Sequence, residues 1–199
     1  MALQRVRSPE LEHDVGRTPN LGYEPAGTYG FVRFLEHGFP NPLVRWHYHE
    51  EYELHLIVAT RGKVFVGDYI GQFEPGHLVL TGPRLPHNWI STEVPEGGVA
   101  LRDMVLQFAD APLRQAAAQI PELAEALPLL ERARYGIEFF GLSERLRERI
   151  TRVKQLHGLQ RFAEFTELLG ELAGSNDYRL LSTVQLQSFD DDAALARIS

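Results

Sequence analysis

The sequence predicts a mainly β domain, a sandwich or barrel of short strands, followed by a helical region that ends in a two-helix hairpin. Between residues 28 and 109, short runs of aromatic and β-branched residues alternate with Gly and Pro turn signals. After residue 108 the composition changes to alanine and other good helix formers. The chain has 199 residues and 44% hydrophobic content, which is enough to bury a core without covalent staples.

The chain divides into four predicted segments. Residues 1–27 are polar, contain several prolines and glycines, and are predicted to form an N-terminal leader. Residues 28–110 form the barrel, and residues 111–187 form the helical region. Residues 188–199 begin with three aspartates and are predicted to start a linker or a helix.

The strands are predicted from β-branched and aromatic runs between turns. In order, they cover residues 28–36, 43–49, 52–60, 63–66, a short stretch within 67–73, 77–81, 88–91 and 99–108. Alternation in the 52–60 strand places Glu53, His55 and Ile57 on one face and the apolar residues between them on the other.

The helices are predicted from spacing and from start and stop signals. An Ala-rich helix covers 112–119, and a second covers 122–134, where Pro128 is expected to kink or divide it. Residues 135–140 read as a strand. Ser143 is a plausible N-cap for a helix that reaches His157, and Gly158 separates it from a helix over 159–173. The short link predicts an antiparallel hairpin.

Composition excludes several functions. The net charge of −7 disfavours direct binding of a phosphate backbone, which depends on clustered Lys and Arg. The absence of cysteine excludes disulfides and thiolate metal sites. The sequence has no apolar run near the roughly 20 residues that a membrane span needs, and no signal peptide. We therefore expect a cytoplasmic protein with no membrane contact.

The most informative stretch is Arg45–Glu53, which contains His-x-His-x-x-x-Glu. His47 and His49 point to the same face of a strand, and Glu53 has the same parity. His87, in a Gly-Pro-x-x-Pro-His loop, is the best candidate for a fourth ligand from another strand. Three imidazoles and a carboxylate suit Zn, Ni, Fe or Mn. A hydrogen-bonded polar cluster without metal is the alternative.

Five residues are predicted to line a ligand pocket beside this site. His55 shares the face of Glu53, Trp89 has the parity of His87, and Arg33 can meet an anionic ligand. The aromatic residues Trp46 and Phe65 complete the set. Aromatic residues in strands more often belong to a core, and lone arginines more often form surface ion pairs.

These residues resemble the motifs of the cupin family. The family's first motif, His-x-His-x-x-x-Glu followed by a turn glycine, is matched by His47, His49, Glu53 and Gly62. Its second, a Pro-Gly turn, a strand and a proline-associated histidine, is matched by Pro75–Gly76 and Pro86–His87. The resemblance implies a double-stranded β-helix, or jelly-roll, barrel with a divalent metal on the three histidines and the glutamate.

A narrower resemblance covers nearly the whole chain after residue 26. Segments 45–54, 65–68, 73–83 and 85–89 are similar to the sensor half of AraC-type transcription regulators, as are 129–137, the helix pair and 178–181. The resemblance implies a barrel that binds a small-molecule effector and a homodimer contact on helices 143–173. In such regulators a DNA-binding half follows the sensor. Residues 192–199 are similar to its beginning, so we expect the natural protein to continue past Ser199 and to bind DNA only through that half.

Two other functions remain open from the sequence. One is a stand-alone metal-dependent cupin enzyme, a dioxygenase or an isomerase, in which an open metal position faces a pocket. The other is a dimeric scaffold without a ligand. The regulator hypothesis assigns no catalytic residue, and we expect the chain not to be an enzyme.

Overall fold

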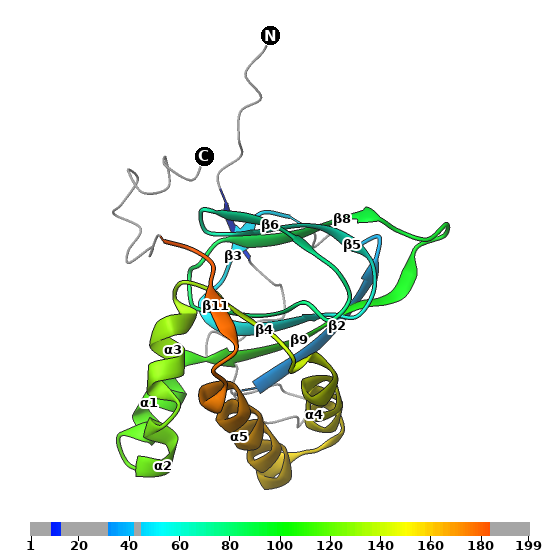
Figure 1. Cartoon of the computed structure of the whole chain (residues 1–199). Helices are drawn as coiled ribbons and strands as arrows, with labels where there is room; N and C mark the ends of the chain where they lie inside the picture. The colour runs from blue at the N-terminus through cyan, green and yellow to red at the C-terminus, as the bar shows by residue number, and fades with distance from the viewer. Residues whose placement is uncertain (1–8, 13–31, 42–44, 184–199) are drawn as a thin grey trace.

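The computed structural model describes residues 9–12, 32–41 and 45–183. Two β-sheets face each other, and the helices pack on the outer side of one of them (Figure 1). This confirms a mainly β protein with helices toward the C-terminus. Most of the predicted leader, the first residues of the 28–36 and 43–49 strands, and the predicted linker 188–199 lie outside the described residues.

The smaller sheet has five strands. Their order is β1 (Glu10–Leu11), β3 (His47–Tyr48), β8 (His87–Glu93), β5 (Arg61–Val66) and β6 (Tyr69–Phe73). β1 runs parallel to β3, and the other neighbours are antiparallel. A short N-terminal segment is therefore part of the sheet that carries His47 and His87.

The larger sheet has six antiparallel strands. Their order is β11 (Tyr178–Leu180), β10 (Ile137–Phe139), β7 (Leu78–Thr81), β4 (Glu51–Ile57), β9 (Val99–Ala109) and β2 (Val32–Phe39). The chain changes sheet between β4 and β5 and between β7 and β8. Residues close in sequence thus come to opposite walls of the space between the sheets.

Strand β4 is buried on both faces. Tyr52, Leu54 and Leu56 belong to the core that joins the six-stranded sheet to the helices. Ile57 belongs to a second core between the two sheets, with Val64, Val66 and Trp89. The predicted alternation of this strand is confirmed, and it directs Glu53 and His55 into the space between the sheets.

The helices are α1 (Asp110–Ala117), α2 (Pro121–Ala124), α3 (Leu127–Ala133), α4 (Ser143–Gln155) and α5 (Gly158–Gly174). Pro128 lies in the first turn of α3, so the predicted helix 122–134 is divided there, as expected. Ser143 is the first residue of α4 rather than its N-cap. The region predicted to be helical also contributes β10 and β11, and β11 was not predicted.

Gly62 is required by a close approach of two strands. A Cβ at this position would clash with the carbonyl oxygen of Ile90 on β8. The ladder between β5 and β8 shifts register between Arg61 and Gly62. A side chain here would force β5 away from β8, which is the strand that carries His87.

Candidate metal centre

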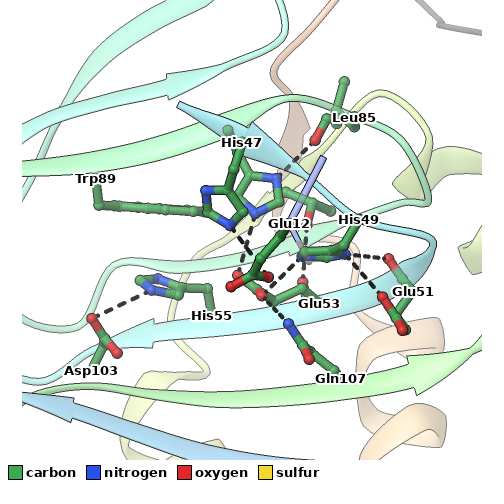
Figure 2. A network of polar contacts seen from close by, with 12 residues as sticks. Glu12, His47, His49, Glu51, Glu53, His55, Leu85, Trp89, Asp103 and Gln107 are labelled. Carbon is green, nitrogen blue, oxygen red and sulfur yellow. Dashed lines mark hydrogen bonds and ion pairs between the residues drawn. The ribbon is translucent and has the colours of Figure 1, made fainter. Parts of the chain in front are cut away.

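The four predicted ligands come together between the two sheets. Figure 2 labels three of them, His47, His49 and Glu53. The antiparallel ladder of β3 and β8 pairs His47 directly with His87. His49 follows β3, and Glu53 lies on β4 of the opposite sheet. The donor atoms of the three histidines lie within 4.8 Å of one another. The ring centroids of His47 and His87 are 4.6 Å apart, and those of His49 and His87 are 4.9 Å apart.

Glu53 faces two of the three imidazoles. Its Oε2 lies 3.0 Å from Nε2 of His49, and its Oε1 lies 3.6 Å from Nε2 of His87. Gln107 of β9 donates a hydrogen bond of 2.8 Å to Oε2. The ladder of β4 and β9 pairs Glu53 with Gln107, which explains why this amide reaches the carboxylate.

Each histidine ring is held through Nδ1 by a backbone carbonyl two residues away. The Nδ1 atoms of His47 and His87 lie 2.8 Å from the carbonyl oxygens of Arg45 and Leu85. Nδ1 of His49 lies 3.0 Å from the carbonyl oxygen of Glu51. A carbonyl oxygen only accepts, so Nδ1 carries the hydrogen in each ring, and Nε2 is left to act as the ligand atom.

The contact between His49 and Glu53 needs one more hydrogen than a neutral imidazole and a carboxylate provide. Both nitrogens of His49 face oxygen acceptors, since Nε2 meets the Glu53 carboxylate and Nδ1 meets a carbonyl. A neutral imidazole has only one hydrogen to donate. The second hydrogen belongs to an imidazolium at His49 or to a protonated Glu53, or a cation bound to Nε2 and Glu53 takes its place.

The electrostatics favour neutral imidazoles at His47 and His87 and an ionised carboxylate at Glu53. Burial lowers the pKa of His87 well below its ordinary value, and it also lowers the pKa of His47. Burial alone would raise the pKa of Glu53, but the hydrogen bond and charge of His49 outweigh it and hold that pKa well below the ordinary range. A neutral His47, a neutral His87 and an ionised Glu53 are forms that bind a metal ion, whereas His49 would have to release its second proton to the ion.

These residues fit a divalent metal. Nε2 of His87 is buried and has no hydrogen-bond partner in the described part of the chain, a costly arrangement that a metal bond would satisfy. Two donors bound to one ion at about 2.1 Å lie at most about 4.2 Å apart. The Glu53 contacts of 3.0 and 3.6 Å meet this limit. The widest histidine separation would have to shorten by roughly 0.6 Å.

A cavity of about 50 Å³ adjoins the cluster. Its lining includes His47, Glu53, His55, Trp89, Arg102 and Gln107. The two rings that form one wall are stacked, since the centroids of His55 and Trp89 lie 3.9 Å apart with the planes at 20°. The cavity thus offers an aromatic wall, an amide and one edge of the histidine cluster to a ligand.

Three lining residues of this cavity, His37, His55 and Arg102, belong to an ion-pair network around Asp103. Asp103 of β9 accepts hydrogen bonds of 2.7 Å from both His37 and Arg102, and it lies 3.5 Å from His55. Burial alone would raise the pKa of Asp103, but the charge of His55 and the hydrogen bond from His37 hold it below its ordinary value. The hydrogen bond to Asp103 raises the pKa of His37.

The structure brings some of the predicted pocket residues to the cavity and not others. His55 and Trp89 line it. Phe65 lies on the opposite side of β5 from the buried Val64 and Val66, so its side chain faces away from the space between the sheets. Arg33 and Trp46 also lie outside the lining. Arg33 lies on the same face of β2 as the lining residues Leu35 and His37, but it is near the N-terminal end of the strand.

The polar residues that line the cavity but were not predicted as site residues include Glu12, His37, Asn41, Asn88 and Gln107. Gln107 and Asp103 have one parity on β9, a pattern that would have placed them together once β9 was paired with β4. Glu12 lies in the segment predicted to be a leader, and its Oε2 is 4.0 Å from Nε2 of His47. No spacing in the sequence connects Glu12 with the histidines.

Comparisons with known proteins do not assign a family. No protein-family model matches the sequence, and no curated protein matches it. Among solved structures, ToxT from Vibrio cholerae O395, crystallised with (E)-4-(8-methylnaphthalen-1-yl)but-3-enoic acid, is similar at a TM-score of 0.40 and 12% identity. The match covers 71% of this chain and 56% of that chain, so this chain spans little more than half of its length. A likeness this low does not establish a shared fold.

None of the helices in the described ranges has the length and apolar character needed to cross a lipid bilayer.

The fold and the site together define a mainly β domain with a three-histidine cluster between its sheets that could bind a metal ion.

Proposed function

We propose that this chain is the effector-sensing and dimerisation domain of an AraC-type transcription regulator, built on a cupin barrel with a divalent metal in its interior. One observation carries the proposal. Three imidazoles from two segments are each held through Nδ1 and turn Nε2 toward one point, where Glu53 also lies. Two packed sheets that exchange strands are compatible with the jelly-roll topology.

His47, His49, Glu53 and His87 would hold the metal, which would supply a Lewis-acidic centre for an oxygen or nitrogen atom of the effector. The carbonyls of Arg45, Glu51 and Leu85 fix the rings in the tautomer that binds. The amide of Gln107 orients the carboxylate of Glu53. The chain thus presents a prearranged donor set on rigid strands.

The cavity limits the kind of effector. A buried water molecule needs roughly 10–15 Å³ of comparable volume, so about 50 Å³ admits a group of a few non-hydrogen atoms. We propose that the effector inserts one compact polar end between the histidine cluster and the stacked rings of His55 and Trp89. A larger effector has to displace lining residues.

The remaining parts of the chain suit transmission rather than DNA contact. The net charge of −7 disfavours gripping a phosphate backbone. Helices α4 and α5 form a hairpin joined by ion pairs of Arg149 with Glu164 and Glu171. We propose that this hairpin carries the homodimer contact in the cytoplasm, and that effector binding biases a DNA-binding half outside this sequence.

One observation favours a metal-dependent enzyme as a second candidate. His55 lines the same cavity as His47 and Glu53, and its Nε2 lies 3.5 Å from Asp103. A histidine beside a metal centre can act as a general base. Turnover of a small oxygen-containing substrate by the metal-loaded protein, lost in His55→Gln with metal binding intact, would favour the enzyme over the sensor.

The proposal is tested by direct metal binding. Protein purified without chelator is analysed for metal content, then stripped and titrated by calorimetry with Zn²⁺, Ni²⁺, Fe²⁺ and Mn²⁺ separately. We expect one site per chain, with affinity lost in His49→Ala. The control is His157→Gln, which removes an exposed histidine. Failure of all four ions to bind would overturn the metal site. A metal-loaded protein that binds no small polar compound would overturn the sensor.

A further inference from the structure

The N-terminal segment is attached to the strand that carries His47. The N–H groups of Glu10 and Glu12 donate hydrogen bonds of 3.2 and 2.9 Å to the carbonyl oxygens of Trp46 and Tyr48. In this parallel pairing Glu10 lies opposite His47. Glu12, the residue that follows β1, is thereby placed beside the histidine cluster, although it precedes Trp46 by 34 positions in the sequence.

Glu12 points into the site (Figure 2). Its Oε2 lies 4.0 Å from Nε2 of His47, the atom that the Nδ1 hydrogen bond leaves as a ligand. The side chain is only 13% exposed, and Glu12 lines the cavity together with His47 and Glu53. A separation of 4.0 Å is within the limit of about 4.2 Å for two donors on one ion.

Charge balance explains why a second carboxylate would lie here. Three neutral imidazoles, one carboxylate and a divalent cation leave a net charge of +1 in an interior where uncompensated charge is costly. Glu12 supplies the missing negative charge.

We infer that Glu12 is a further ligand of the metal, supplied by the N-terminal segment, so that metal binding fastens β1 onto β3. This inference rests on the metal site of the proposed function. It gives residues 9–12 a role as part of the centre rather than as a leader. It also predicts that an anionic effector group competes with Glu12 for the metal and thereby loosens the N-terminal segment.

The test compares Glu12→Gln with Glu10→Gln, which removes the same charge from an exposed position two residues earlier, on β1. Affinities for Zn²⁺ and Ni²⁺ alone are measured by calorimetry on the stripped chain. We expect Glu12→Gln to weaken binding about tenfold or more, the scale on which a lost partner at a metal site acts. Glu10→Gln is expected to leave the affinity unchanged.

Hydrogen exchange gives an independent result, since the amides of Glu10 and Glu12 bond to β3. Zn²⁺ is expected to slow their exchange in the wild-type chain and in Glu10→Gln, but not in Glu12→Gln. Equal affinities and equal protection in the two variants would overturn the role of Glu12 and leave the histidine site intact. No metal binding by the wild-type chain would overturn both.

Discussion

Replacing His87 with glutamine removes one imidazole ligand from the proposed centre while keeping a side chain that can hydrogen-bond to the carbonyl of Leu85. Metal at 100 times its Kd adds about 2.7 kcal/mol to the stability of the wild-type chain. Because 1 kcal/mol shifts Tm by about 2–4 °C in a domain of this size, the expected shift is about 5–11 °C. A site weakened a hundredfold retains about 0.4 kcal/mol, or less than about 2 °C.

The assay is thermal unfolding of the stripped protein with and without Zn²⁺, at one fixed metal concentration for every variant. His157→Gln is the matched control, because its side chain is exposed and distant in sequence from the site. It should show the full wild-type shift. An equal shift in His87→Gln and wild type would refute the reasoning, since the stabilising ion would then bind elsewhere.

Three further predictions concern stability, each measured by urea unfolding with chelator present. Burial lowers the pKa of His77 to about 3, so the unfolded chain takes up a proton below about pH 6.5 that the folded chain does not. The free energy of unfolding should therefore decrease as the pH is lowered, by about 2 kcal/mol from this group between pH 7 and pH 5. His77→Gln should lose correspondingly less stability over the same range. An unchanged pH slope in this variant would contradict the prediction. Phe165 is fully buried against Phe108, and Phe165→Ala should cost about 3–5 kcal/mol; a loss below 1 kcal/mol would show that α5 is not anchored there. Gly62→Ala should lower the free energy of unfolding by about 1–3 kcal/mol or more, because the new Cβ clashes with β8. The control Gly170→Ala, in open space on α5, should raise it by about 0.5–1 kcal/mol. Equal effects of the two substitutions would show that the close approach to β8 is not the cause.

Local periodicity was sufficient to predict much of the site. Alternation in β4 placed Glu53 and His55 on one face, and the same rule made His47 and His49 a pair. The position of His87 followed from its motif, and the ladder that pairs it with His47 gives the physical reason. The predictions for Glu53, His55, His47 and His49 depend on strand alternation, which is set by neighbours along the chain, whereas His87 was predicted from its motif and reaches the cluster through a non-local ladder.

Other features depend on contacts that no local pattern records. In β5 both Val64 and Phe65 are apolar, so alternation alone does not tell which of them faces the interior. The two-residue strand β1 carries no periodicity, and its place is set by pairing with β3. Strand β11 adds to the sheet edge through β10 after 38 intervening residues. Non-local pairing of short segments therefore decided the parts that the sequence did not predict.

The location of the hydrophobic core decides what the metal can do in this protein. The larger core lies between the six-stranded sheet and the helices, on the far side of β4 from Glu53. Because that core does not depend on the histidine cluster, the chain is expected to fold without the ion, unlike small domains whose folding energy comes from metal binding. The rings are already oriented by backbone carbonyls, so metal and effector can bind and leave with little change in the rest of the fold. Any signal must then travel through the elements that touch the site directly. Among the described residues, β1 is a two-residue strand at a sheet edge that pairs only with β3, so it is the element that we expect to move first.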